Sequence, residues 1–384
     1  MRDRILIDAS NTNISIPGGG SFCVRAYIEA MLALFPNKID ILHPEEAHIR
    51  DERYRTIDVP KRKPYHLLAD GIKGYLHRGA RFLINHLRKN PDTYSMIFYN
   101  SGLLAGGTIE LVKNTGAKVV ILHHNFESEY HIACRSAATL KGRTDRYVRY
   151  WERIGYTHAG INLFLTQYDK DIFEKEYGLH TQNHVTGVFE PTEINTYQKL
   201  TKRNKTAVIT CALGDEQNQA SLLHFIKHYL PIFKQVLPDW EIVMMGRNPS
   251  KQLLDIANQK EELSVIANPK NINELAAQSS IYLCPMDTGG GLKLRIMDGL
   301  RVGQPLLIHQ RSARGYEMFI DCPFMKMYNN ATSFKLGLSE LQHWLHSTPN
   351  TQNQITQAYI EHFGFDVGLK RLSNILRLDN LLDI

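Results

Sequence analysis

Short apolar runs alternate with amphipathic segments along most of the chain, and this alternation predicts an α/β protein. The runs are apolar at successive positions, which is typical of strands covered on both faces of a parallel sheet. Residues 21–35 show helical periodicity instead, with apolar positions recurring every three or four residues. The pattern places strands at residues 4–9, 95–100, 118–122, 161–166, 207–210, 240–245, 264–266, 281–285 and 306–308.

The second half of the chain shows the clearest order of elements. After the strand at 207–210 comes a helix through Leu222 and Phe225, then the strands at 240–245 and 264–266, and then a helix at 273–279. The order strand, helix, strand, strand, helix, strand implies parallel pairing with right-handed crossovers. In the first half, Thr166 and Asp169 form a capping box, which predicts that a helix begins there.

A glycine loop, Gly289 to Gly291, separates the strand at 281–285 from the next helix. Gly303 stands where a helix C-cap glycine belongs, and Pro305 opens the following strand. A glycine loop before a helix, at the carboxyl end of a parallel strand, is typical of an anion site. The backbone N–H groups point outward there, and the absence of Cβ atoms lets an anion come close. Three consecutive glycines are also compatible with a plain flexible turn.

Charged residues after this loop favour the anion site. Lys293 and Arg295 fall in the predicted first helical turn, where cations are unfavourable for the helix itself. That conflict indicates that they serve a ligand. Asp298 follows one turn after Arg295, either as a solvated helix residue or as a carboxylate that accepts hydrogen bonds from a ribose.

The composition is that of a soluble globular protein and limits which classes of protein remain possible. The 384 residues suffice for two or three domains, with 43% hydrophobic and 22% charged residues. Five cysteines without C-x-x-C pairing indicate a reducing compartment, with neither a disulfide framework nor a zinc site. The apolar run near the N-terminus is too short for a signal peptide, and no stretch approaches about 20 apolar residues. A net charge of +6 does not by itself indicate nucleic acid.

Residues 50–89 are the most basic part of the chain, and apolar positions interleave with the cations. Such a segment can lie on an anionic membrane surface, with its apolar side down and its cations at the headgroups. The alternative is a solvated helix pair whose apolar face belongs to the domain core. Residues 140–157 combine basic residues with Tyr147, Tyr150 and Trp151. This combination favours a helix with one charged face and an aromatic stripe that packs into the core.

Polar residues crowd the end of the strand at 118–122. His123, His124, Asn125 and Glu127 follow it, and this is where an α/β fold presents its ligands. Either histidine can instead be a satisfied structural residue, and Glu127 or Glu129 can cap the next helix. Two adjacent histidines without a third ligand at helical spacing do not make a metal site.

The stretch from Gly289 to Pro305 resembles a motif of the GT-B glycosyltransferases. The retaining, family-4-type enzymes of polysaccharide assembly often carry G-S-G-x-K-x-K-x-x-E-A-x-A-x-G-x-P, and this chain has GGGLKLRIMDGLRVGQP. The resemblance is specific over residues 207–317 and weak elsewhere. It implies a GT-B fold, in which two Rossmann-like α/β domains face each other across a cleft.

This resemblance implies a glycosyltransferase that moves a sugar from a nucleotide-sugar to a glycan, lipid-linked glycan or protein, with retention and without a metal or other cofactor. It implies catalytic roles for His124, Lys293 and Arg295, and an acceptor or sugar side at Asn125 and Glu127. The implied donor-binding residues are Gly19, Gly20, Arg247, Gly289, Gly290, Gly291, Leu292, Lys293, Arg295, Asp298 and Glu317.

The chain departs from the family pattern in two places. The first Glu of the family's E-x7-E pair falls on Gly290, and Asp215 to Gln217 stand where an Arg and a Lys often hold the diphosphate. These departures leave open a non-catalytic subunit that binds a partner enzyme or glycan. A sugar-nucleotide epimerase on the same fold is a second alternative.

The same resemblance suggests the domain limits and the cellular setting. We expect an N-terminal acceptor domain at 1–190, a linker at 191–206, a nucleotide-sugar domain at 207–365, and a terminal helix at 366–384 that crosses back to the first domain. Relatives that act on lipid-linked acceptors dock through a basic, apolar patch, which favours a cytoplasmic protein that is peripheral on the inner membrane face through residues 50–89. No nucleic-acid partner is expected, and the oligomeric state stays open.

Overall fold

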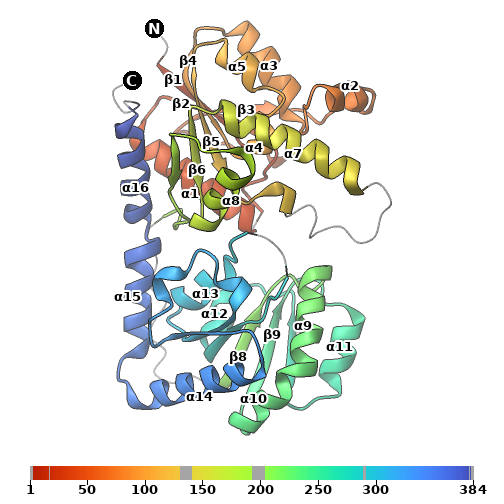
Figure 1. Cartoon of the computed structure of the whole chain (residues 1–384), viewed down its shortest axis with the longest axis vertical. Coiled ribbons are helices and arrows are strands. Elements are labelled where there is room, and N and C mark those ends of the chain that lie inside the picture. The colour runs from red at the N-terminus through yellow and green to blue at the C-terminus, as the bar shows by residue number, and fades with distance from the viewer. Residues whose placement is uncertain are drawn as a thin grey trace. The chain divides into compact units, whose positions relative to one another are not determined.

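The computed structural model describes residues 3–16, 18–129, 141–192, 204–288, 291–379 and 381. The chain divides into two compact units, each built around its own parallel sheet with helices packed against it (Figure 1). Unit 1 comprises Met1–Ile194 and Phe363–Ile384, and unit 2 comprises Asn195–His362. Most of the predicted linker, residues 193–203, lies outside the described residues.

Unit 1 has a seven-stranded sheet in the order β3-β2-β1-β4-β5-β6-β7. Every neighbouring pair is parallel, and the central strands are buried along nearly their whole length. This burial agrees with the continuous apolar runs of the sequence, because helices cover both faces of a parallel sheet. The strands are β1 (Arg4–Asp8), β2 (Ile39–Pro44), β3 (Arg55–Val59), β4 (Tyr94–Tyr99), β5 (Lys118–His123), β6 (Ile161–Phe164) and β7 (Asn183–Val185).

Unit 2 has a six-stranded parallel sheet in the order β10-β9-β8-β11-β12-β13. In both sheets the strand order reverses beside the first strand, between β1 and β4 and between β8 and β11. Ligands of open α/β sheets bind at the carboxyl ends of the strands at such a switch point. The strands are β8 (Asn204–Thr210), β9 (Glu241–Gly246), β10 (Leu263–Ala267), β11 (Ser279–Cys284), β12 (Leu306–His309) and β13 (Met325–Tyr328).

Helices join the strands as crossover connections. Unit 1 contains α1 (Gly19–Leu34), α2 (Leu67–Ile72), α3 (Gly79–Lys89), α4 (Gly102–Ala105), α5 (Ile109–Lys113), α7 (Lys141–His158), α8 (Gln167–Tyr177) and α16 (Phe365–Leu378). Unit 2 contains α9 (Glu216–His228), α10 (Leu230–Val236), α11 (Lys251–Asn258), α12 (Ile272–Ala277), α13 (Arg295–Arg301) and α14 (Ala331–Ser347), and α15 (Thr351–Phe363) ends at the unit boundary. Among the described residues, none of the helices has the length and apolar character needed to cross a bilayer.

The structure adds the strands β2, β7 and β13, which the sequence pattern did not place, and corrects the predicted order of elements at two further points. Unit 2 has a helix, α11, between β9 and β10, where the sequence predicted two successive strands. The Ser250 side chain caps α11 by accepting a hydrogen bond from the Leu253 N–H. In unit 1, residues 55–59 of the basic segment form the edge strand β3 and not a helix. The N-cap bond of the predicted capping box is confirmed, since the Thr166 hydroxyl accepts from the Asp169 N–H; the hydroxyl also donates to the Asp169 carboxylate at 2.6 Å.

The last helix, α16, belongs to unit 1 and packs against α1. Arg371 on α16 donates to the Val188 carbonyl at 3.3 Å. At Gly368 the helix comes so close to Phe189 that an added Cβ would lie 2.0 Å from the ring. Unit 1 is therefore completed by a segment that follows unit 2 in the sequence.

Gly246 ends β9 and shows how tightly the carboxyl edge of unit 2 is built. A Cβ at this position would lie 1.7 Å from the Cys211 carbonyl oxygen, a backbone atom that cannot move aside. We expect Gly246→Ala to destabilise unit 2 by at least about 2 kcal/mol, and so to lower its melting temperature by roughly 4–8 °C. Differential scanning calorimetry measures this shift. Gly20→Ala is the matched control, because nothing lies within 4 Å of that added Cβ, and equal losses in both variants would contradict the prediction.

Candidate functional site

The carboxyl edge of the unit 1 sheet joins three loops through one chain of hydrogen bonds. Asn100, which follows β4, donates to the Thr12 hydroxyl at 3.3 Å. Its Oδ1 lies 2.7 Å from the His124 Nε2, just after β5. Thr12 belongs to the loop after β1, so this chain spans the switch point between β1 and β4. His124 therefore lies where this fold places ligands.

The two adjacent histidines have different surroundings. His123 is 2% exposed, stacks on Phe164, and has Nε2 2.8 Å from the Asn162 Oδ1, so it is an interior residue. His124 is half-buried, and burial lowers its pKa to about 4. With Oδ1 of Asn100 facing it, Nε2 of the neutral ring donates and Nδ1 stays an acceptor. The structure thus brings His124, and not His123, to the carboxyl edge.

Asn125 and Glu127 continue the same loop, and residues 127–129 are helical. Burial raises the pKa of the Glu127 carboxyl to about 7, and the Asn125 side chain offsets part of that rise. This carboxyl therefore binds a proton more readily than an ordinary glutamate does. Such a group can exchange a proton with a hydroxyl that binds beside it.

Gly19 and Gly20 form the first turn of α1, so the helix begins two residues earlier than the sequence predicted. Both are exposed, and the Gly18 N-cap provides no side-chain hydrogen bond. The first N–H groups of a helix have no partner within the helix. In α1 these donors lie after β1, on the same side of the switch point as Thr12.

The predicted anion loop of unit 2 follows β11. Gly289 and Gly290 lie outside the described residues, and Gly291 has φ +68°, a conformation that favours glycine. The helix α13 starts at Arg295, so Lys293 precedes it and does not lie in its first turn as predicted. The Tyr316 hydroxyl donates to the Lys293 carbonyl at 2.9 Å and holds this part of the loop.

Lys293 and Arg295 lie near the carboxyl ends of the central strands. Burial raises the pKa of the Cys284 thiol, at the end of β11, and the charges of Lys293 and Arg295 offset part of that rise. Arg295 acts in the same way on Cys211, which follows β8 and whose pKa burial raises to about 12. Lys293 and Arg295 are therefore near enough to the end of β11 to act on Cys284, and Arg295 also acts on Cys211 after β8.

The other predicted donor residues lie around this point. Leu292 is half-buried in the same loop, and Arg247 is exposed after β9. Asp298 forms an ion pair at 2.7 Å with Arg301, which lies three residues further along α13. Glu317 is exposed and accepts from the Gly315 N–H at 2.9 Å, within its own turn.

Asp215 has a local structural role that explains one departure from the family pattern. Its carboxylate accepts from the Gln217 and Asn218 N–H groups, each at 3.1 Å, and so caps α9. A lysine or arginine at this position could not make this cap. The predicted cations are then Arg247, after β9, and Lys293 and Arg295, which follow β11 on the other side of the switch point.

Two groups escaped the sequence analysis. Asp287, two residues after Pro285, accepts from Ser221 at 2.7 Å and pairs with His224 at 3.1 Å. Its position directly after β11 was the available signal. Glu152 on α7 is a buried carboxylate, and its four-residue spacing from Val148 and Tyr156, both buried, could have placed it on an interior face.

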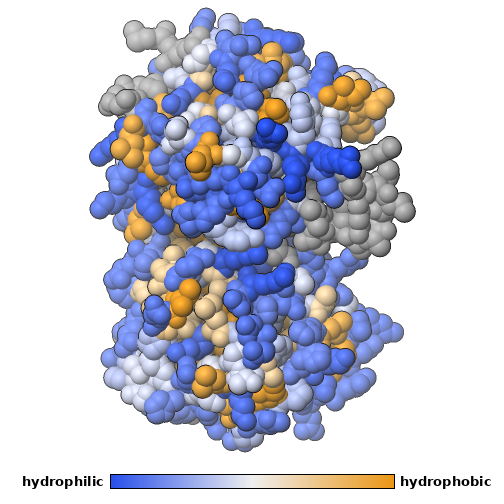
Figure 2. Space-filling model, viewed as in Figure 1, coloured by the Kyte–Doolittle hydropathy of each residue, from blue (hydrophilic) through white to orange (hydrophobic). Residues whose placement is uncertain are grey.

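Helix α2 exposes large apolar side chains. Tyr65, Leu67, Leu68 and Ile72, here called the α2 patch, are 55–80% exposed, and Figure 2 shows hydrophobic residues gathered over this helix. A hollow of about 410 Å³ beside them is lined by Arg62, Leu76 and Tyr147, among others. The exposed cations Lys61, Lys63 and Lys73 flank the patch. In α3, by contrast, Leu83, Ile84 and Leu87 are buried, so the apolar face of that helix belongs to the core of unit 1.

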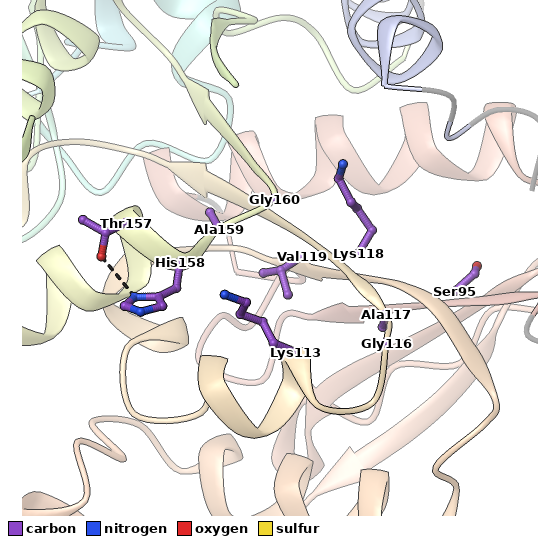
Figure 3. A pocket seen from close by; sticks show the side chains of 10 residues that line it. All are labelled: Ser95, Lys113, Gly116, Ala117, Lys118, Val119, Thr157, His158, Ala159 and Gly160. Carbon is purple, nitrogen blue, oxygen red and sulfur yellow. Dashed lines mark hydrogen bonds between the residues drawn. The ribbon is translucent and has the colours of Figure 1, made fainter. Parts of the chain in front are cut away.

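A larger hollow, of about 570 Å³, lies on unit 1 around the amino ends of β4, β5 and β6 (Figure 3). Lys113, Lys118 and His158 line it, with a floor of small residues between them. Lys118 lies 4.0 Å from the Asp379 carboxylate. The hollow contains no predicted site residue and lies at the opposite edge of the sheet from His124.

No protein-family model and no curated protein matches this sequence. Solved structures match nearly the whole chain. HepE from Anabaena in complex with UDP has a TM-score of 0.68 at 11% identity, covering 98% of this chain and all of that one. Sucrose-phosphate synthase from Thermosynechococcus elongatus gives 0.72 at 11% identity and 99% of each chain, and trehalose 6-phosphate synthase from Burkholderia multivorans gives 0.63 at 12% identity and 100% of each.

These proteins are GT-B glycosyltransferases. Their likeness extends over both units, and each unit of this chain has the parallel, doubly wound sheet that the resemblance implied. The predicted fold class is therefore confirmed: the chain has the two-domain α/β fold of the GT-B glycosyltransferases.

Proposed function

We propose that the protein is a glycosyltransferase that moves a sugar from a nucleotide-sugar to the hydroxyl of a glycan, lipid-linked glycan or protein. One observation carries this proposal: Lys293 and Arg295 lie near the carboxyl ends of the strands at the switch point of unit 2, where open α/β sheets bind their ligands. HepE has been solved with UDP and with UDP-glucose, which supports a uridine diphosphate sugar as donor.

The two cations would stabilise the leaving group. When the bond between the anomeric carbon and the diphosphate oxygen breaks, negative charge grows on the diphosphate. Preorganised positive groups at that position stabilise the transition state more than the ground state. Two full charges exceed the partial charge of about half a unit at a helix N-terminus, so transfer without a metal is consistent with this site.

Unit 1 would supply the sugar and acceptor side. His124 is neutral, so its ring can exchange hydrogen bonds with sugar hydroxyls without adding charge. Glu127, with its raised pKa, is suited to hold the acceptor hydroxyl and to exchange its proton. We also propose retention, which the resemblance to the family-4-type enzymes implies: the acceptor oxygen would bond to the anomeric carbon on the face from which the diphosphate leaves.

A thermal-shift panel tests the donor class. UDP, GDP, ADP, CMP and their common sugars are each added with and without EDTA. A ligand at about 100 times its Kd stabilises the native state by about 2.7 kcal/mol, which raises the melting temperature by roughly 5–10 °C. We expect this rise with UDP and a UDP-sugar, unchanged by EDTA. No rise with any nucleotide would overturn the transferase proposal in favour of a non-catalytic subunit.

We further propose that the α2 patch docks on the inner face of the membrane, where a lipid-linked acceptor is presented. The exposed apolar side chains of Leu67, Leu68 and Ile72 would enter the headgroup boundary. Lys61, Lys63 and Lys73 would face anionic headgroups, each contributing about 1 kcal/mol.

A further inference from the structure

Glu152 is a carboxylate buried in the interior of unit 1. It lies on α7 between Val148 and Tyr156, on the face that packs inward, and is 1% exposed. An aromatic cluster of Phe126, Tyr156, Phe164 and Phe173 adjoins it. Burying a carboxyl group among apolar side chains is unfavourable unless hydrogen bonds compensate for the lost water.

Three neutral donors satisfy this carboxylate. Its Oε1 accepts from the Glu127 backbone N–H at 2.7 Å. Its Oε2 accepts from the Ser128 hydroxyl at 3.0 Å and from the Tyr177 hydroxyl at 2.8 Å. Burial raises the pKa of Glu152 to about 7, and the nearby Glu127 carboxyl contributes to that rise. Among the described residues, Glu152 is therefore held by hydrogen bonds from neutral donors and not by an ion pair.

These bonds tie one loop to two helices. Glu127 and Ser128 directly follow His124 and Asn125, whereas Glu152 belongs to α7 and Tyr177 to α8. Glu127 is the first helical residue of its segment, so its N–H has no partner within the helix. Phe126, which separates Asn125 from Glu127, packs edge-on against Phe173. The loop is thus fixed at successive residues that come after His124 and Asn125.

We propose that Glu152 is a positioning residue, which sets the place of His124 and Glu127 at the carboxyl edge by anchoring the loop at Glu127 and Ser128. The effect of this anchoring on catalysis rests on the proposed function. The anchoring itself does not depend on that function. At 1% exposure Glu152 cannot touch a substrate. It acts through the loop alone.

Substitutions at Glu152 separate anchoring from charge. In Glu152→Gln the amide oxygen can still accept from the Glu127 N–H, and the amide nitrogen can donate to the Ser128 and Tyr177 hydroxyl oxygens, which rotate to accept. Glu152→Ala loses all three bonds and leaves a backbone N–H unpaired. We therefore expect the glutamine variant to behave like the wild type and the alanine variant to release the loop.

The first readout needs no substrate. His124 is titrated by NMR in protein labelled with ¹⁵N-histidine, and His124→Gln assigns its signal. Because burial holds the pKa of His124 at about 4, a released loop should raise that value by about one pH unit or more toward the ordinary value near 6.5. We expect this rise in Glu152→Ala but not in Glu152→Gln. Asp40→Asn, at a fully buried carboxylate that hydrogen-bonds Tyr94 near the amino end of β4, is the control for general destabilisation.

Kinetics give the second readout. With a UDP-sugar that the wild type turns over, Glu152→Ala should lower kcat about 100-fold, the effect of a misplacement of about 1 Å. The Kd of UDP should stay within about twofold, because Lys293 and Arg295 hold it in unit 2. If Glu152→Ala does not fold, Tyr177→Phe, which removes one anchor bond, should show a smaller change in the same direction.

An unchanged pKa of His124 in folded Glu152→Ala would overturn the inference, as would a glutamine variant as impaired as the alanine variant. Failure of the proposed function looks different. The wild type would then neither bind UDP nor turn over a UDP-sugar, while the histidine titration would still decide whether Glu152 anchors the loop.

Discussion

Replacing both Lys293 and Arg295 by alanine is expected to abolish measurable sugar transfer while leaving the protein folded. Removing one preorganised donor from a developing anion typically lowers kcat by about 10²–10³-fold, and in the proposed function both cations would face the same diphosphate. Neither side chain is buried, so the loss of native packing should be small. UDP affinity measured by calorimetry and turnover of a UDP-sugar together test this expectation.

The single variants and a control sharpen the result. Each of Lys293→Ala and Arg295→Ala should weaken UDP binding on its own, and Asp298→Ala should do so through the ribose. Lys335→Ala removes an exposed cation of α14 and should change neither affinity nor turnover. If all three site variants bound UDP as the wild type does, the donor site would not lie in this loop.

The second large effect is expected at the α2 patch. The double variant Leu68→Glu with Ile72→Glu should lower partitioning onto anionic vesicles on the order of 30-fold, because about 2 kcal/mol of apolar burial is lost and two anions are added. Co-sedimentation with vesicles of phosphatidylglycerol and phosphatidylcholine measures it. Both residues are more than 70% exposed, so folding should be preserved.

Leu179→Glu provides the matched control for this experiment. Leu179 is 89% exposed in the same unit but lies outside the patch. We expect Leu179→Glu to partition onto anionic vesicles as the wild type does. Both proteins should bind vesicles of phosphatidylcholine alone more weakly than the anionic vesicles. Equal partitioning of the wild type onto both vesicle types would argue against an electrostatic membrane contact.

The central strands were predictable because parallel sheets need continuous apolar runs, and β1, β4, β5 and β11 have them. The edge strand β3 was not, since alternating charges such as Arg55 and Asp58 hide it within a basic segment. The helix α11 was missed for a related reason. It is short, lies in a polar stretch, and is specified mainly by its Ser250 cap.

The candidate residues were predictable to the extent that they follow strands. His124 and Arg295 stand beside strand ends, so topology alone brings each to a carboxyl edge. Which histidine faces the edge depends on a one-residue difference in strand register, which the sequence pattern does not resolve. Glu152 was missed because a charged residue normally indicates a solvent-facing position, although its spacing from Val148 and Tyr156 was an available signal.

The return of α16 to unit 1 has a consequence for the order of biosynthesis. Ribosomes add roughly 5–20 residues per second, so all of Asn195–His362 must be translated before Phe363–Ile384 emerges. For roughly 10–30 s the nascent first unit lacks the helix that covers α1 and Phe189. During that interval unit 2, which is continuous in sequence, can finish folding first, and the earliest-made part of the chain is completed last.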